Sequence, residues 1–380
     1  MLFADQRPAR SPRPGAPRPH SQREADMPTT AAPTAPAPST RLRRRRLFGL
    51  AGVAALLAAG LVASLVLGAR DVPLSTALEA IPRLRSILAD PDAFGPDEQV
   101  IAELRLPRTL LAVVVGAALG AAGALIQGHT RNPLADPGII GISSGAALAV
   151  VAGFAFLGIA TPLPSAVVAF GGAIAATAAV FALASIGRGV VNPLTLVLGG
   201  AALSAVLSSV TAGLVLTDSQ NLDRMRFWTV GSVAGRDLDV VWAIAPLVAL
   251  GLVAALATGP TLNVLNLGED AAAALGVNTG RHRVAGMLII ALLAGAATAA
   301  AGPIGFVGLL VPHLARGLCG PDYRWILPYS AAWGAALLLI ADVAARLVAR
   351  PGELQVGIVL AFVGAPFFLY LLYRGKVGTV

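Results

Sequence analysis

Charged residues are scarce in this chain. Asp, Glu, Lys and Arg make up 13% of its 380 residues, whereas hydrophobic residues make up 56%. A soluble domain carries about a quarter charged residues, so the composition excludes an ordinary soluble domain and indicates a membrane protein. No charged side chain occurs between residues 109 and 128, and none occurs between 137 and 187.

Cysteine and lysine are nearly absent as well. The single Cys319 excludes an internal disulfide and a Cys-x-x-Cys metal site. The single Lys376 follows Gly375, but Tyr370 and Val377 stand where a phosphate-binding loop needs Gly and Ser or Thr. ATP-driven work would therefore need another chain. The four histidines are far apart in sequence, so we expect no metal site, no cofactor and no enzyme activity.

Acidic residues are missing from almost every apolar run. The exception is Asp342, which lies four residues before Arg346 and predicts an ion pair on one helix face. No nucleophile stands near a base, so no intramembrane catalytic site is expected. Intramembrane acids usually mark ion coupling. Their scarcity weighs against the main alternative of a different class, an ion-coupled secondary transporter.

What the sequence does contain is a series of uncharged runs of membrane-spanning length. About 20 helical residues cross a bilayer core of roughly 30 Å. Breaks such as TPLPS (161–165) and GPIG (302–305) divide the longer runs. We therefore predict an all-α polytopic membrane protein with ten transmembrane helices, and a short outside helix around 74–88. The spans are expected at 47–69, 108–128, 138–158, 164–186, 193–217, 240–258, 284–301, 306–318, 326–345 and 355–373.

The N-terminal region differs in composition from the rest. Its first 40 residues contain nine prolines, so residues 1–46 are predicted to be a disordered, Pro/Arg-rich cytoplasmic tail and 47–375 the membrane domain. Met27 is an alternative start of translation. The run RLRRRR (41–46) places both termini in the cytoplasm. Without it the remaining Arg and Lys divide into 8 inside and 10 outside, so the orientation depends on this run.

Two segments of the chain resemble each other. Residues 105–127 and 281–305 both place paired arginines before a Gly/Ala-rich span, and in the expected topology they run in opposite directions. This pattern indicates an inverted repeat of five plus five spans. The alternative is that Gly/Ala-rich spans simply look alike.

Two connecting segments predict defined local structure. In RNPLADPGIIG (131–141), Pro133 and Pro137 fix the backbone, which predicts a stiff turn. In LNLGEDAAAALGV (265–277), two acids precede four alanines and Gly276 follows, which predicts a short capped helix on the inside.

Several ordered motifs resemble the FecCD family, the permease subunits of ABC importers for ferric siderophores, haem and cobalamin. They are residues 105–147, WTVGSVAGR (228–236), 265–277, 302–349 and 352–372, and the resemblance covers about 45–375. It implies a dimer of permeases, formed by two copies or with a sister subunit. It also implies two ATPase subunits inside and a substrate-binding protein outside. GHTRNPLADPG (128–138) favours a siderophore substrate, with haem or cobalamin as the alternative.

The resemblance also implies residue roles. Docking of the binding protein falls to Arg105, Arg108 and Arg346, for which anchoring to lipid head groups is the alternative. The cytoplasmic gate falls to Asn132, Pro133 and Leu134, for which a plain rigid loop is the alternative. ATPase coupling is assigned to the segment that contains Gly268, Glu269, Asp270, Leu275 and Gly276, for which an ordinary amphiphilic loop is the alternative.

The translocation path is predicted from residue spacing. Ser204, Ser208 and Thr211 are four and three residues apart, so they share one face of a helix. A weakly polar wall suits a bulky chelate that must not bind tightly. Hydrogen bonding between packed helices is the alternative.

Overall fold

The structure is a computed structural model that describes residues 40–185 and 193–373. Every regular element within these two ranges is helical. Seven of the described helices are long and apolar enough to cross a membrane: α1 (Thr40–Val66), α4 (Leu106–Thr130), α6 (Pro162–Ser185), α7 (Pro193–Leu216), α9 (Leu238–Leu265), α11 (Thr279–Ala301) and α13 (Tyr323–Val348). Three more are apolar but shorter: α5 (Ile142–Leu157), α12 (Val307–Cys319) and α14 (Val356–Tyr373). These ten helices occupy the ten apolar segments that the sequence predicts.

Four further α-helices lie in the connections between them. The expected outside helix is present as α2 (Leu74–Ala89). The connection α8 (Ser219–Val230) is helical although its sequence gave no such expectation, and Asp218 caps it by accepting the amide of Gln220 at 2.9 Å. The others are α3 (Pro96–Gln99) and α10 (Glu269–Ala274).

Two helix starts differ from the prediction. Helix α1 begins at Thr40, so residues 40–46 of the expected disordered tail are helical; the rest of that tail lies outside the described residues. The second expected span begins near residue 96 instead of 108, because α3 continues through a π-helical segment, Val100–Arg105, into α4. A π-helical turn changes the register of the side chains that follow.

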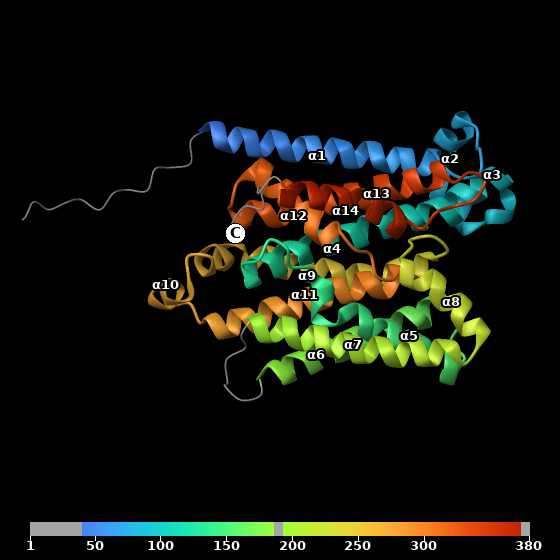
Figure 1. Cartoon of the computed structure of the whole chain (residues 1–380). Coiled ribbons are helices and arrows are strands. Elements are labelled where there is room, and N and C mark those ends of the chain that lie inside the picture. The colour runs from blue at the N-terminus through green and yellow to red at the C-terminus, as the bar shows by residue number, and fades with distance from the viewer. Residues whose placement is uncertain (1–39, 186–192, 374–380) are drawn as a thin grey trace, which may run out of the picture. The chain divides into compact units, whose positions relative to one another are not determined.

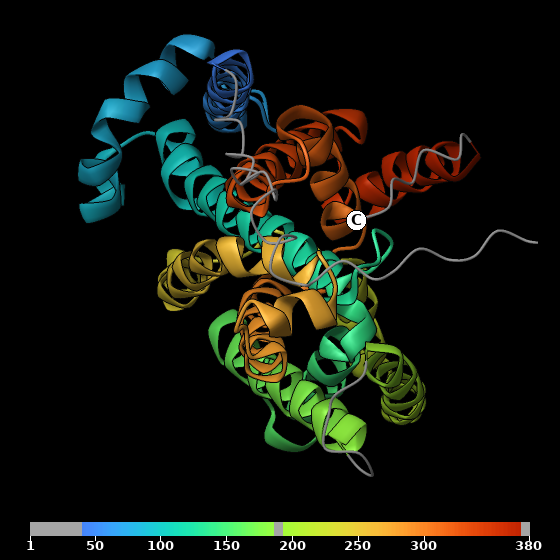
Figure 2. The same ribbon diagram turned by 90° about the vertical axis from the view of Figure 1, so that its left-hand side faces the viewer.

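Helix α4 occupies the middle of the described helices (Figures 1 and 2). It packs against α13 and α12 on one side and against α11 and α9 on the other, while α5, α6 and α7 pack together beyond α11. Glycine makes the close approach to α13 possible. A Cβ on Gly116 would lie 2.3 Å from the carbonyl oxygen of Gly334, and one on Gly120 would lie 2.0 Å from that of Ser330. This is the Gly-x-x-x-Gly packing typical of membrane helices.

Helix α12 is too short to cross a bilayer by itself. Its 13 residues rise about 20 Å. An irregular segment, 302–306, precedes it and packs against the end of α8, where a Cβ on Gly302 would lie 2.4 Å from the Trp228 carbonyl oxygen. Beside it, the Ser232 amide donates to the Ala301 carbonyl at 2.7 Å. Irregular backbone at membrane depth is tolerated where protein covers it or where it lines a cavity.

Contacts between distant segments identify two opposite ends of the helices. At one end, Arg46 donates to the Cys319 carbonyl at 2.9 Å, and Arg131 donates to the Leu265 carbonyl at 2.5 Å. Helix α10 lies at this end, whereas α2, α3 and α8 lie at the other (Figure 1).

Candidate functional site

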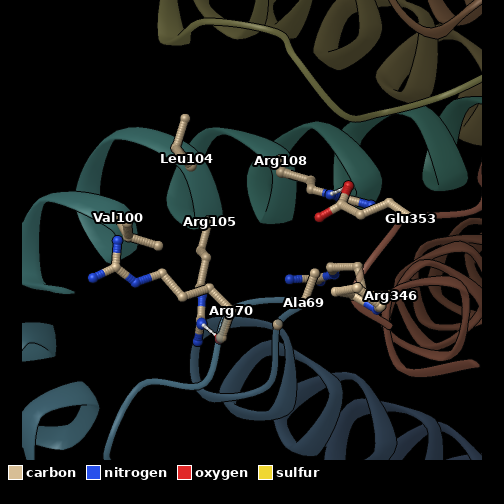
Figure 3. Close-up of a pocket in the computed structure, with 10 residues that line it drawn as sticks. Ala69, Arg70, Val100, Leu104, Arg105, Arg108, Arg346 and Glu353 are labelled. Atoms are coloured by element: carbon tan, nitrogen blue, oxygen red, sulfur yellow. Dashed lines mark hydrogen bonds and ion pairs between the residues drawn. The ribbon is translucent and has the colours of Figure 1, made fainter. Parts of the chain in front are cut away.

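Three arginines expected to dock a binding protein lie together at the end that carries α2 and α3. Arg105 ends the π-helical segment, Arg108 comes from the first turn of α4, and Arg346 comes from the last turns of α13 (Figure 3). They line one open cavity of about 510 Å³, together with Arg70 and Glu353. The fold therefore brings together residues that are more than 230 positions apart in the sequence.

Asp342 joins two of these arginines. Arg108 Nε lies 3.0 Å from both Asp342 carboxylate oxygens and its Nη2 lies 2.9 Å from Oδ1. Arg346 Nη2 lies 2.9 Å from Asp342 Oδ2, so the i,i+4 pair predicted from the spacing is confirmed. Glu353 Oε2, from the loop before α14, accepts from Arg108 Nη1 at 2.6 Å. The positive charges of Arg108 and Arg346 are thus balanced by the negative charges of Asp342 and Glu353.

Arginines also cap the C-terminal end of α1. The last carbonyl groups of a helix have no partner within the helix and favour cations. Arg346 donates to the Ser64 carbonyl at 2.9 Å and to that of Leu67 at 3.1 Å. Arg105 donates to the Leu65 carbonyl at 2.9 Å, and Arg350 donates to the Gly68 carbonyl at 2.6 Å.

These internal contacts leave the three predicted docking residues little exposed. The exposed fractions are 4% for Arg105, 7% for Arg108 and 2% for Arg346. The accessible charges nearby belong to neighbours that the sequence analysis missed, Arg350 and Glu353 among them. Nothing in the local sequence marks these two, because their partners come from distant helices. A docking role for the three arginines stays a prediction.

The segment expected to couple to an ATPase forms a small corner between α9 and α11. Gly268 precedes α10 with φ of 123°, a conformation that side chains disfavour. Glu269 pairs with Arg283 at 2.6 Å, which fastens the corner to α11. At the other end, the Gly276 amide donates to the Ala273 carbonyl at 2.9 Å and the Val277 amide to that of Ala272 at 3.0 Å. This is the Schellman ending that the glycine predicted.

The corner exposes two leucines beside its two acids, Glu269 and Asp270. Leu267 is 68% exposed and Leu275 is 65% exposed, one on each side of α10. Asp270 belongs to the first turn of α10, where the helix dipole favours an acid. The helix is therefore held to α11 at its start, ended by a glycine, and presents two leucines outward beside its acids.

The segment 131–141 forms a tight turn, as predicted. Asn132 Oδ1 accepts the Leu134 amide at 2.9 Å, and the Asn132 carbonyl accepts the Ala135 amide at 3.1 Å, with Pro133 between them. Gly141 ends the turn with φ of 82°. Leu134 is exposed at the tip. The gate role of Asn132, Pro133 and Leu134 stays a prediction.

One acid in this turn has a perturbed protonation equilibrium. Burial raises the pKa of Asp136, while the Gly138 amide, 2.8 Å from its Oδ1, acts in the opposite direction. The carboxylate caps the short helical turn 137–140.

The three hydroxyl residues expected along the path share one side of α7. Ser208 and Thr211 line a cavity of about 340 Å³ between α7, α5 and α8. The Ser204 hydroxyl faces Gly141, where an added Cβ would lie 3.8 Å from its oxygen. Thr211 Oγ1 donates to its own helix, to the Leu207 carbonyl at 2.8 Å. Their role in the path stays a prediction. In the described parts of the chain, no group of three His, Cys, Asp or Glu residues could hold a metal ion.

Comparison with known proteins places the chain among transport permeases. The FecCD transport family matches residues 56–374. The Fe(3+)-citrate import system permease protein YfmD of Bacillus subtilis is 47% identical over 283 residues, which cover 74% of this chain and 84% of that protein. The ferric enterobactin transport system permease protein FepD of Escherichia coli is 41% identical over 329 residues, which cover 87% and 96%.

A solved structure is also similar. It is a metal-chelate type ABC transporter in an inward-facing conformation, with a TM-score of 0.74 and 31% identity over 86% of this chain and 98% of that one. Further matching relatives are named as hydroxamate, cobalamin and hemin permeases.

Proposed function

Because the chain belongs to the FecCD transport family, we propose that it is the permease subunit of an ABC importer that carries a ferric siderophore across the cytoplasmic membrane. A separate subunit hydrolyses the ATP. Ferric citrate and ferric enterobactin in the names of two relatives support an iron chelate as substrate. Haem or cobalamin is the second candidate, because relatives with those names match as well.

We propose that all ten apolar helices cross the membrane. Seven are long enough by themselves, and α5, α12 and α14 complete the count with the help of adjoining segments such as 302–306. An even number of crossings puts both termini on one side, and the basic run before residue 47 favours the cytoplasm. Helix α10 and the turn 131–141 are then inside. The arginine cluster, by which we mean Arg105, Arg108 and Arg346, is outside. The five-plus-five repeat stays a prediction.

The observation that carries the importer proposal is the α10 corner. Full burial of a leucine stabilises a complex by about 1.5–3 kcal/mol. Leu267 and Leu275 together therefore offer a few kcal/mol to a partner with an apolar groove. A helix that is fastened to α11 by the Glu269–Arg283 pair and ended by a Schellman motif can transmit a rigid-body shift, whereas a mobile loop would absorb it. Both properties suit a coupling element that inserts into an ATPase subunit.

The outer surface suits a docking protein. The cavity of the arginine cluster opens to this side, Arg70 is exposed in its lining, and Arg350 is exposed next to Pro351, which also lines it. We expect acidic residues of a substrate-binding protein to approach the rim of this cavity above Arg105, Arg108 and Arg346. Charges at a rim chiefly raise the association rate. Reversing Arg70 to Glu should therefore slow association with the binding protein, most strongly at low salt.

The exposed side of α7 suits a second permease subunit, either another copy of this chain or a sister subunit. Only 17% of its apolar window is buried within the chain. A partner that packs against α7 would enclose a path between the two subunits, with Ser204, Ser208 and Thr211 near its wall and Asn132, Pro133 and Leu134 at its inner mouth.

A co-purification experiment tests the importer proposal. We expect L275D to lose the ATPase from the purified complex, because an ionised carboxylate replaces the apolar anchor. L78D is the matched control, since Leu78 is an exposed leucine of α2 at the opposite end. Gel filtration and thermal melting should show both variants folded. Retention of stoichiometric ATPase and normal uptake by L275D would refute the coupling role. Uptake by the chain alone in proteoliposomes would favour an ion-coupled transporter instead.

A further inference from the structure

A second cavity lies beside the arginine cluster and has no role in the function proposed above. Its volume is about 300 Å³. The loop between α13 and α14 borders both cavities, with Glu353 in the first and Gln355 in the second. The second cavity is otherwise formed by the ends of α5, α6, α8 and α11 and by the segment that joins α8 to α9. It therefore belongs to the same outer face.

The walls of this cavity combine aromatic rings with guanidinium groups. Phe154 comes from α5, and Phe227 and Trp228 come from α8. Arg224 of α8 and Arg236 of the following segment supply the positive charge. Neutral polar groups come from Ser165, Ser232 and Gln355. Within residues 40–185 and 193–373, no Asp or Glu lines the cavity.

The two arginines are not neutralised by ion pairs among the described residues. Arg224 lies over the Phe154 ring, with Cζ 5.5 Å from the ring centre. Arg236 Nε donates to the Ala300 carbonyl at 2.9 Å, and Asp237 beside it offsets its charge only through space. By contrast, Arg226 on the same helix as Arg224 pairs with Asp223 at 3.1 Å. Arg236 is partly buried, whereas Arg224 is exposed. A partly buried guanidinium without an anion is unfavourable, and an exposed one attracts an anion, so this cavity favours an anionic occupant.

Ring faces and guanidinium groups together select a flat anion. An aromatic ring of the ligand can stack in an offset or edge-to-face arrangement against Phe154 or Trp228. Guanidinium groups bind paired oxygens in a two-pronged, charge-assisted geometry. Adjacent phenolate oxygens of a catechol, or a carboxylate on an aromatic ring, have this arrangement.

The size of the cavity limits what enters it. Sites for whole drug-sized ligands span about 300–1,000 Å³, so this cavity is at the lower limit. It accommodates one substituted aromatic ring but not a complete metal chelate with several such arms.

We propose that this cavity binds one anionic aromatic arm, of the catecholate or aryl-carboxylate type, of a ferric chelate at the outer face. The inference rests on the importer function and narrows its substrate class. Chelates with charged aromatic arms are recognised by the permease itself, in addition to the binding protein. Neutral hydroxamate chelates gain nothing from Arg224 and Arg236.

A titration of the purified chain in lipid nanodiscs tests this proposal. The probe is the gallium(III) tris(2,3-dihydroxybenzoate) complex, which is anionic and redox-inert, and binding is followed by tryptophan fluorescence. Gallium(III) tris(benzohydroxamate) is the control probe, because it is aromatic but neutral. We expect saturable binding of the anionic complex and at least about tenfold weaker binding of the neutral one.

Two variants of α8 make the test specific. R224Q should weaken binding of the anionic complex about tenfold, because a charge-assisted contact is lost. R224K should fall between R224Q and the unmodified chain. R226Q is the matched control, two residues away, and should bind normally because Arg226 lines a different cavity. We choose R224Q and not R236Q, because Arg236 donates to the Ala300 carbonyl at the end of α11 and its loss would disturb folding.

The outcomes separate the cavity from the importer function. Equal binding of both probes, equal binding by R224Q and the unmodified chain, or no binding at all would overturn the cavity proposal. ATP-driven uptake of a ferric chelate by the reconstituted complex is measured in parallel. Uptake without any effect of R224Q in the titration refutes the cavity alone. Absence of uptake for every chelate refutes the importer function, whatever the titration gives.

Discussion

Helices α4 and α7 have similar length and similar small apolar residues, yet they differ in how the chain uses them. The apolar window of α4 is 78% buried and that of α7 is 17% buried. In α4, glycines face the backbone of α13 and α12 at distances that no side chain permits. In α7, a Cβ on Gly200 would lie 2.1 Å from the Ile139 carbonyl oxygen, but one on Gly199 or Gly213 would meet nothing within 4 Å. Small residues therefore hold α4 in place along its length but leave much of α7 available to another surface.

Charge separates the two helices in the same way. Arg108 ties α4 to α13 through Asp342, whereas the described helix α7 contains no charged residue. A membrane offers no hydrophobic driving force between helices, so packing and polar contacts decide which helices associate. The comparison indicates a fixed centre and a lateral helix, for which we propose a second subunit as the partner.

Removing the charge that fixes α4 should have the largest effect. In D342N, Arg108 and Arg346 lose their shared carboxylate while remaining buried, which should cost about 3–5 kcal/mol. The expected result is a large drop in the thermal midpoint of the detergent-solubilised protein. E353Q is the control, because Glu353 is partly exposed and its loss should cost much less. Equal midpoints for D342N and E353Q would show that the buried triad is not what fixes α4.

Filling the helix contact should have the next largest effect. In G120V the new side chain meets the Ser330 carbonyl, so α4 and α13 must separate. We expect a loss of about 1–3 kcal/mol, the usual cost of overpacking. G213V in α7 is the matched control and should leave thermal stability nearly unchanged. If G213V destabilises the isolated chain as strongly as G120V does, α7 is packed within the chain and the comparison fails.

Cysteine substitutions along α7 should have the smallest effect on the structure, and labelling of these cysteines reports whether α7 faces water. We expect S208C and T211C, in a C319S background, to react with a water-soluble maleimide in the assembled transporter, because a path between subunits is wet. The control is A173C in α6, which should stay unlabelled because Ala173 is fully buried. Protection of S208C and T211C in every transport state would instead indicate packing between helices.

Much of the fold follows from the sequence because each membrane helix carries its own signal. Apolar length and the proline or glycine clusters between runs located all ten apolar helices, and the acid–alanine–glycine pattern located α10. The helix α8 was missed because its charged and polar residues have no apolar periodicity. The start of α4 was misplaced because charges at 97–105 look like loop residues, although they continue the helix.

The site was less predictable because its partners are distant. The Asp342–Arg346 pair could be read from a spacing of four, but Arg108 joins it across 234 residues. Likewise, the carbonyl groups that Arg105 and Arg350 cap belong to the backbone at the end of α1, which has no sequence signature. From the sequence, Arg105, Arg108 and Arg346 therefore indicated a charged outer surface. In the structure, most of their hydrogen bonds are made to groups inside the chain.

The capping of α1 has a consequence for biogenesis. Helix α1 leaves the ribosome well before α13, and two of the guanidinium groups that satisfy its C-terminal carbonyls, those of Arg346 and Arg350, are synthesised some 280 residues later. Until then, lipid head groups and water must solvate that end of the helix. Helix α1 is thus completed only after α13 has been made, and we expect its final lateral arrangement to form when α13 enters the membrane.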